Sequence, residues 1–163
     1  MNTDPIRALA RQVLDRCRAK KFMLVTAESC TGGMIAASLT DIAGSSDVVE
    51  RGFVTYSNAA KTELLGVSAD LIARLGAVSE EVARAMAAGA LAHAPVDLAV
   101  AVTGIAGPGG GSADKPVGLV HFGLARRGGA VRTEHHVFPG DRDAVRRATV
   151  IRALELLLQA VPD

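Results

Sequence analysis

The chain is poor in aromatic residues, and this scarcity bears on its core and on its partners. Only 3% of the 163 residues are aromatic, with no Trp and a single Tyr. Because 49% of the residues are hydrophobic, the core must be built mostly from Ala, Val, Leu and Ile. Proteins that bind single strands by base stacking need aromatic platforms, so this binding class is disfavoured.

Net charge is also nearly absent. The chain has 18 Lys and Arg against 17 Asp and Glu, which gives a formal charge of +1 at pH 7. Proteins that bind nucleic acid through its phosphates carry a clear basic surplus. The charge balance therefore predicts no nucleic-acid partner.

Cysteines and long apolar runs are equally scarce. Cys17 and Cys30 belong to no CxxC pair and no Cys/His cluster, which argues against a disulfide framework and a structural zinc. The first 21 residues lack the apolar core of a signal peptide. No run approaches the roughly 20 apolar residues that span a bilayer. We expect a cytoplasmic protein without a membrane partner.

The sequence does contain an alternation of helical and strand patterns, which we expect to form one domain over residues 1–163. Helices and buried strands interleave, and residues 126–129 predict a hairpin turn. This order predicts an α/β fold, a three-layer α/β/α sandwich with a mixed sheet. The predicted helices span about 6–17, 33–40, 59–65, 68–75, 79–94 and 141–160, and the predicted strands 22–27, 48–56, 98–103, 117–125 and 130–138.

Residues 26–33, TAESCTGG, predict a strand, a polar turn and a helix start. Unpaired N–H groups and the positive dipole end at a helix start stabilise a phosphate or an oxyanion. Ser29 lies at the turn, where a side chain projects over the end of a sheet. Gly32 and Gly33 allow a ligand to approach the backbone closely. Ordinary capping of the helix is the alternative that the local pattern leaves open.

A second polar group lies in residues 55–61, TYSNAAK, where a strand gives way to a helix. It places the phenol of Tyr56 and the amine of Lys61 near one strand end. Ser with Lys is a known nucleophile–base pairing, provided that desolvation or a neighbouring cation keeps the lysine neutral. The alternatives are a solvated helix face for Lys61 and a half-buried sheet position for Tyr56.

Two further segments are candidates for ligand contacts. Thr103 and Gly104 end a buried strand and open a glycine-rich loop, and ligands of α/β sheets collect beyond such strand ends. The loop has neither Walker A nor GxGxxG spacing, so a mobile surface loop remains the alternative. Arg142 starts the last helix, where the helix dipole disfavours a cation. A phosphate or carboxylate ligand, or an ion pair with Asp141 or Asp143, would account for it.

Together these blocks resemble the CinA C-terminal domain family. The resemblance rests on four segments in the same order, and it extends from about residue 6 to residue 160. The segments are AESCTGG (27–33), YSNAAK (56–61), TGIAGP (103–108) with KPVG (115–118), and GDR (140–142). It implies a three-layer α/β/α fold and the activity of a nicotinamide-nucleotide amidohydrolase, an enzyme that cleaves a linear amide.

The resemblance also implies roles for individual residues. Ser29 matches the nucleophile, Lys61 its general base, and Tyr56 a third catalytic residue that assists proton transfer or orients Lys61. Residues of the surrounding motifs are expected to contact the substrate. These are Thr31, Gly32, Gly33, Thr103, Gly104 and Arg142, the last through our inference of a phosphate contact. The role of Glu28 stays open: it either supports Lys61 or makes a structural hydrogen bond.

The expected reaction is a two-step acyl transfer that converts nicotinamide mononucleotide to nicotinic acid mononucleotide and ammonia. N–H groups near residues 31–33 are expected to hold the oxyanion, and no metal or organic cofactor is needed. The expected partner is a small pyridine nucleotide, and we expect a homo-oligomer, with a dimer favoured. Two alternatives stay open: a non-catalytic nucleotide-binding or damage-response module on the same fold, and an amidase with Cys30 as nucleophile.

Overall fold

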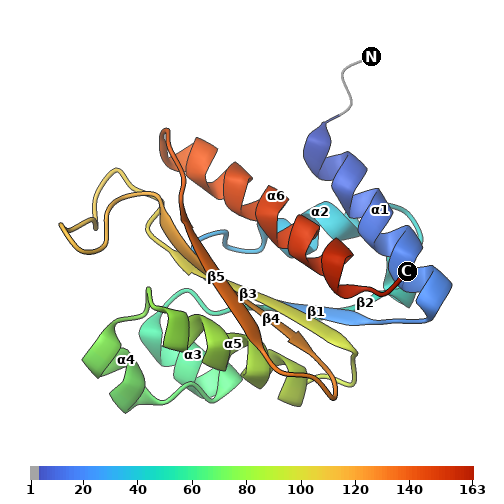
Figure 1. Ribbon diagram of the computed structural model, residues 1–163, viewed down its shortest axis with the longest axis horizontal. Coiled ribbons are helices and arrows are strands. Elements are labelled where there is room, and N and C mark those ends of the chain that lie inside the picture. The colour runs from blue at the N-terminus through green and yellow to red at the C-terminus, as the bar shows by residue number, and fades with distance from the viewer. Residues whose placement is uncertain (1–3) are drawn as a thin grey trace.

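Five strands form one mixed sheet in the computed structural model, which describes residues 4–163 (Figure 1). They are β1 (Leu24–Glu28), β2 (Val49–Val54), β3 (Leu98–Gly104), β4 (Leu119–Arg126) and β5 (Arg132–Val137). Their order across the sheet is β2-β1-β3-β4-β5. β1 is parallel to both β2 and β3, whereas β4 is antiparallel to β3 and β5 to β4. The predicted mixed sheet is confirmed.

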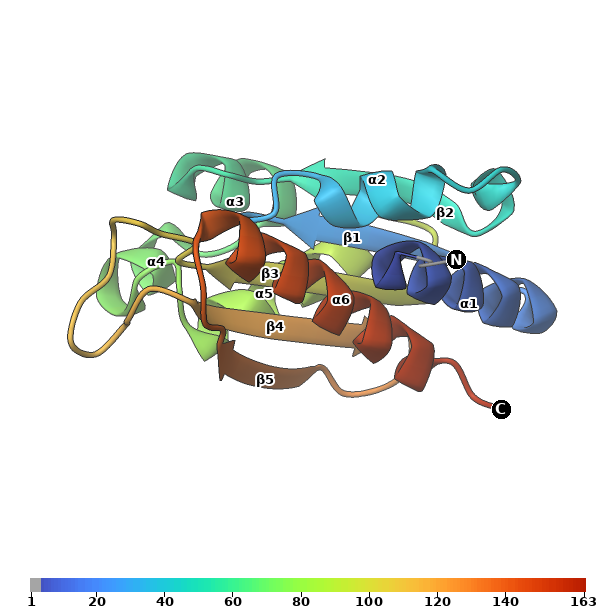
Figure 2. The ribbon, with the colours of Figure 1, turned by 90° about the horizontal axis from the view of Figure 1, so that it is seen from above.

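Helices cover both faces of the sheet, as the views of Figures 1 and 2 show. One layer contains α1 (Pro5–Lys20), α2 (Met34–Thr40) and α6 (Arg142–Ala160). The other contains α3 (Asn58–Leu65), α4 (Ala69–Leu75) and α5 (Glu80–Ala92), and a short 3-10 helix, η1 (Ser45–Asp47), precedes β2. The three-layer α/β/α prediction is therefore confirmed.

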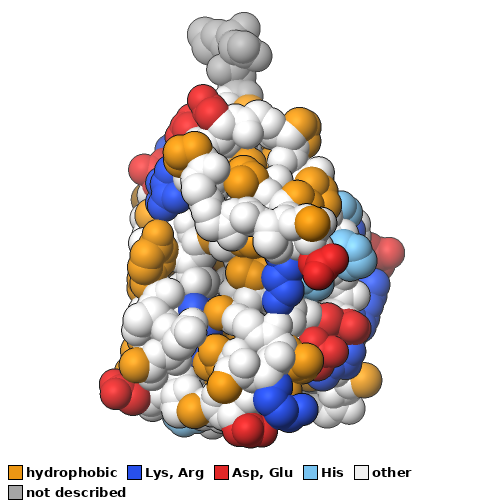
Figure 3. Space-filling view, turned by 90° about the vertical axis from the view of Figure 1, so that its left-hand side faces the viewer, with side chains coloured by type: hydrophobic (Ala, Val, Ile, Leu, Met, Phe, Trp, Pro, Cys, Tyr) orange, Lys and Arg blue, Asp and Glu red, His pale blue; other side chains and the backbone are white. Residues whose placement is uncertain are grey.

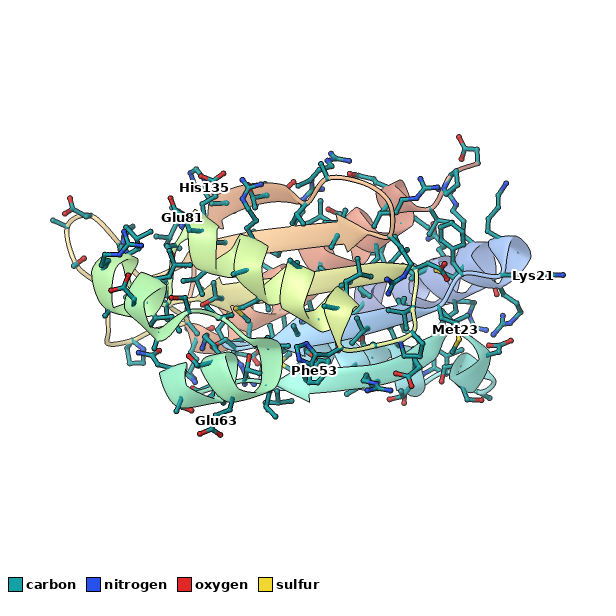
Figure 4. All side chains as sticks on the ribbon, turned by 90° about the horizontal axis from the view of Figure 1, so that it is seen from below. Lys21, Met23, Phe53, Glu63, Glu81 and His135 are labelled. Carbon is teal, nitrogen blue, oxygen red and sulfur yellow. The ribbon has the colours of Figure 1, made fainter. Side chains whose placement is uncertain are left out.

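The alternation of side chains along each strand divides the core in two. Leu24 of β1 packs with the layer of α1, α2 and α6, whereas its neighbour Val25 packs with the opposite layer. On that second side α5 lies very close to β4, since a Cβ at Gly123 would meet the Ala83 carbonyl oxygen at 2.3 Å. A core with few aromatic residues is thus filled by small side chains and close backbone approach. Figure 4 views this layer.

Local caps set most of the helix starts. Asp4, Ser57 and Asp141 each accept a hydrogen bond from a first-turn N–H of the helix that follows. The strand boundaries differ from prediction by one or two residues. β1 starts at Leu24 rather than at residue 22, since the N–H of Met23 donates to the Asp97 side chain.

The topology brings four chain segments to one edge of the sheet. The carboxyl ends of the parallel strands β1, β2 and β3 meet there, and β5 ends at the same edge because it is antiparallel to β4 (Figure 2). The segments that follow these four ends contain Ser29, Tyr56, the loop after Gly104 and Arg142. Ligands of open α/β sheets bind at such an edge.

Among residues 4–163, no helix is long and apolar enough to cross a membrane. Cys17 and Cys30 are both buried, and both are free thiols. Within the same residues, no group of three or more His, Cys, Asp or Glu side chains is placed to hold a metal ion.

Candidate active site

Ser29 lies directly after β1, within hydrogen-bonding distance of a buried lysine. Lys61 Nζ is 2.9 Å from Ser29 Oγ, although the two residues are 32 positions apart in the sequence. Lys61 is on α3, whose start is set by the Ser57 cap. Ser29 is 8% exposed and Lys61 only 1%. The solvated helix face that the sequence left open for Lys61 is therefore not its environment.

The surroundings of Lys61 suit a neutral amine. Burial lowers its pKa below the ordinary value of 10.5, and the nearby Cys30 opposes this shift. Nζ also donates to the carbonyl oxygens of Thr55 at 2.9 Å and of Tyr56 at 3.3 Å. A neutral amine has two N–H groups and one lone pair, so these carbonyls accept both hydrogens. The lone pair is then left for Ser29 Oγ, as a general base requires.

Glu28 caps a helix, and among the described residues it forms no hydrogen bond or ion pair with Lys61. Its carboxylate accepts hydrogen bonds from the Thr31 hydroxyl at 2.5 Å, the Ile35 N–H at 2.8 Å and the Ala36 N–H at 3.0 Å. The structural role that the sequence left open is therefore the observed one. Because the side chain is 1% exposed, these three donors replace the water that an ionised carboxylate would lose.

This cap corrects the prediction of an anion site at the start of α2. The N–H groups of Ile35 and Ala36 already bind the Glu28 carboxylate, so they are not available to a phosphate. The Gly32 N–H is also engaged, since it donates to the Ser29 carbonyl at 3.0 Å. In contrast, the N–H groups of Cys30 and Thr31 have no hydrogen-bond acceptor among residues 4–163. Of these two unpaired N–H groups, that of Thr31 lies within the range 31–33 expected for oxyanion donors, and that of Cys30 directly precedes it.

Tyr56 contributes to the site in two separate ways. Its carbonyl binds Lys61, as described above. The residue is 60% exposed, and its phenol oxygen accepts a hydrogen bond from Arg142 Nη2 at 3.2 Å. Arg142 Nη1 donates to the Gly107 carbonyl at 2.9 Å. Arg142 thus links the segment after β2 to the loop after β3, and it forms no ion pair with Asp141 or Asp143 within the described chain.

Thr103 and Gly104 shape the floor of the site at the end of β3. The Thr103 hydroxyl donates to the Ala77 carbonyl at 2.9 Å, which holds the segment before α5 against the strand. At Gly104 a Cβ would meet Val120 Cγ2 at 2.7 Å and the Leu119 carbonyl oxygen at 2.9 Å, so only glycine fits. Both residues line the cavity in front of Ser29.

Cys30 is a poor nucleophile in this environment. Burial raises the pKa of its thiol to about 11, so the reactive thiolate is scarce at neutral pH. The side chain is 6% exposed. The alternative of a cysteine amidase is therefore disfavoured by the structure.

Two neighbouring cavities open at this edge of the sheet. The first, of about 210 Å³, contains Ser29 and Lys61, and it also reaches Tyr56, Asn58 and Arg142. The second, of about 500 Å³, lies between the loop after β3 and the start of α6, and it shares Ala106 and Arg142 with the first. Figure 3 views the molecule from this end, where hydrophobic and basic side chains reach the surface.

Arg146 is a site residue to which the sequence analysis assigned no role. It lies one turn after Arg142 on α6, and its Nε and Nη2 donate to the carbonyls of Cys30 at 3.1 Å and Thr31 at 3.2 Å. It also lines the second cavity. The spacing of four residues from Arg142 places both guanidinium groups on one face of the helix, which is the only signal in the sequence that points to it.

Comparison with known proteins places the chain in a family. The family model of the CinA C-terminal domain matches residues 6–161. The nicotinamide-nucleotide amidohydrolase PncC of Escherichia coli K12 is 50% identical over 159 residues, which cover 98% of this chain and 96% of that protein. A CinA-like protein of Mycolicibacterium vanbaalenii is 59% identical over 138 residues, which are 85% of this chain and 33% of that protein.

Solved structures agree with this placement. The crystal structure of the competence/damage inducible protein CihA from Agrobacterium tumefaciens has a TM-score of 0.94 and 50% identity, and the match covers 98% of this chain and 97% of that chain. A CinA superfamily protein from Escherichia coli has a TM-score of 0.91 and 38% identity, with 98% and 93% covered. The chain therefore belongs to the CinA C-terminal domain family.

Proposed function

We propose that this protein is a nicotinamide-nucleotide amidohydrolase that converts nicotinamide mononucleotide to nicotinic acid mononucleotide and ammonia. The observation that carries the proposal is the 2.9 Å contact of Lys61 Nζ with Ser29 Oγ inside a cavity. The half-identical Escherichia coli relative is named a nicotinamide-nucleotide amidohydrolase, which supports the choice of substrate class. Ser29 is the nucleophile and Lys61 the general base.

The first half-reaction forms an acyl-enzyme. Lys61 Nζ takes the proton of Ser29 Oγ, and Oγ attacks the carboxamide carbon of the substrate. The N–H groups of Cys30 and Thr31 donate to the oxyanion of the tetrahedral intermediate. The Lys61 ammonium then returns its proton to the amide nitrogen, the C–N bond breaks, and ammonia leaves. The electron-poor pyridinium ring favours the attack because it withdraws electron density from the carbonyl.

The second half-reaction reverses these roles with water. Lys61, neutral again, takes a proton from a water molecule that attacks the ester carbon. The tetrahedral intermediate collapses with release of Ser29 Oγ, which regains a proton from Lys61. The product is nicotinic acid mononucleotide, whose carboxyl group gives its proton to the solvent, and the enzyme returns to its starting state. Neither half-reaction requires a metal or an organic cofactor.

The two cavities suggest how a nucleotide lies in the site. The cavity of about 210 Å³ at Ser29 accommodates the nicotinamide ring. The ribose and phosphate extend past Arg142 into the cavity of about 500 Å³. Arg142 is exposed and stands between the two cavities, so its guanidinium is the candidate partner of the phosphate. With the start of α2 closed by Glu28, a side chain rather than a helix end takes this role.

The test is release of ammonia from nicotinamide mononucleotide by the purified protein. Ser29→Ala should remove nearly all turnover, whereas Cys30→Ala, at the neighbouring candidate nucleophile, should keep most of it. Activity lost in Cys30→Ala and kept in Ser29→Ala would reverse the assignment. If the wild-type protein binds the nucleotide in calorimetry but releases no ammonia, the chain is a non-catalytic binding module instead.

A further inference from the structure

Arg146, on α6, holds the backbone directly after Ser29 from the layer opposite to that of Lys61. Its side chain is half-buried, and Nε and Nη2 donate to two successive carbonyls, those of Cys30 and Thr31. In the sequence, Arg146 is 116 positions from Cys30 and 115 positions from Thr31. They also bring the guanidinium close to the turn, since a Cβ at Gly32 would lie 3.5 Å from Arg146 Nη2.

This contact decides where the N–H groups of the turn point. In a trans peptide unit the C=O and the N–H face opposite sides. With the Cys30 carbonyl directed at Arg146, the Thr31 N–H of the same peptide is directed away from it. The Thr31 N–H has no acceptor within residues 4–163, whereas the next N–H, of Gly32, closes the turn on the Ser29 carbonyl. The Cys30–Thr31 peptide is therefore held at its carbonyl, while its buried N–H is unpaired within the described chain.

The charge of Arg146 adds to this orientation. A hydrogen bond from a guanidinium to a carbonyl is stronger than a neutral one, and it polarises the peptide so that the N–H becomes a better donor. Oxyanion donors act through such prior orientation, because no reorganisation is then needed during the reaction.

We propose that Arg146 is a positioning residue that holds the Cys30–Thr31 peptide so that its N–H stabilises the oxyanion formed at Ser29. The proposal rests on the proposed acyl transfer at Ser29. Arg146 also lines the second cavity beside Arg142, so a direct contact with the substrate phosphate is the competing role. The Nε–Nη2 edge, which binds phosphate in the bidentate mode, is already engaged by the two carbonyls.

Steady-state kinetics with two substrates separate these roles. The variants are Arg146→Gln and Arg146→Lys, and the control is Arg147→Gln, at the next residue, whose Nη2 pairs with Asp4 at 3.1 Å on the surface. Positioning predicts that Arg146→Gln lowers kcat by about tenfold or more with little change in KM, since displacement of a catalytic group by ~1 Å costs up to about a hundredfold. The loss should be equal for nicotinamide mononucleotide and nicotinamide riboside.

The remaining outcomes of this experiment are also informative. Arg146→Lys keeps the charge but can donate to only one of the two carbonyls at a time. Its decrease in kcat should therefore be smaller than that of Arg146→Gln. A loss confined to the nucleotide would overturn the proposal in favour of a phosphate contact. An equal loss in Arg147→Gln would also overturn it, since it would reflect the stability of α6 alone.

Labelling of Ser29 by a fluorophosphonate gives a readout that does not depend on the natural substrate. The reagent forms a bond from Ser29 Oγ to phosphorus with loss of fluoride, and the negative oxygen formed in the attack needs the same donors. Mass spectrometry should show slower labelling of Ser29 in Arg146→Gln than in wild type and Arg147→Gln, at temperatures where all three are folded. Equal labelling rates would overturn the positioning role. Slower labelling in a protein that releases no ammonia would uphold it and refute the proposed substrate.

Discussion

The replacement Lys61→Met tests whether the buried lysine is held neutral. Methionine keeps much of the apolar stem but has neither a lone pair nor an N–H group. We expect it to abolish ammonia release, since Ser29 Oγ loses its 2.9 Å partner. The informative measurement is the free energy of unfolding. At this 1% exposed position, the variant loses a hydrogen-bond donor but also removes a buried ionisable amine, and these two changes have opposite effects on stability.

The first effect is destabilising, and the second depends on pH. Methionine leaves the buried Thr55 carbonyl without its donor, at a cost of about 1–3 kcal/mol. On the other side, a lysine with a pKa lowered by burial destabilises the native state. That contribution is complete below the folded pKa, declines as pH rises, and vanishes above the ordinary value of 10.5. Within this pH window, the free energy of unfolding of the wild type should rise relative to that of Lys61→Met by up to ~1.4 kcal/mol per pH unit.

Urea unfolding of wild type and Lys61→Met at pH 7, 8, 9 and 10 measures this difference. Lys20→Met serves as control, because Lys20 is an exposed lysine whose Nζ donates to the Asp163 carbonyl, and it reports the effect of losing a surface ammonium. The stability of wild type relative to Lys61→Met should increase with pH. Parallel stability curves over this range would refute a depressed lysine pKa, and with it the neutral base.

Four further predictions concern the same site. Ser29→Ala, Lys61→Ala and the double variant should fall to the same residual rate, since the two residues act as a unit; a much slower double variant would contradict the pair. Glu28→Gln sets an amide NH₂ against the N–H groups of α2 and should lower the free energy of unfolding by roughly 1–3 kcal/mol; an unchanged urea midpoint would contradict the cap. Nicotinamide mononucleotide should exceed the riboside in kcat/KM by roughly tenfold or more, and Arg142→Ala should narrow this gap; a full gap in the variant would remove Arg142 from phosphate binding. Turnover should persist in EDTA, and loss on chelation with recovery on added zinc or magnesium would overturn the metal-free mechanism.

Much of the fold follows from local patterns in the sequence. Asp4 with Pro5, Ser57 and Asp141 start their helices because capping is an interaction between residues two or three positions apart. Periodic apolar residues predict the helices and strands, because the same residues must face a core at a spacing of 3.6 or 2. The exact strand limits were less predictable, since they depend on partners elsewhere, such as the contact of Met23 with Asp97.

The candidate site was predictable in its members but not in its contacts. The motifs mark Ser29, Lys61, Tyr56 and Arg142, and the topology brings all four to one edge of the sheet. The sequence left Glu28 open between two roles, and it did not reveal that its carboxylate already fills the start of α2. Whether an N–H group is free or engaged depends on side chains that approach from other segments.

The sequence alone therefore determined the order of the elements, the three-layer class and the group of chemically competent residues. Only the tertiary structure decided which of them touch. It places the Lys61 amine against Ser29 across 32 residues and the Arg146 guanidinium against the turn across 116 residues. The physical reason is that periodicity and capping act over a few residues. Burial of an amine, and the orientation of a peptide by a distant cation, arise only when the layers pack.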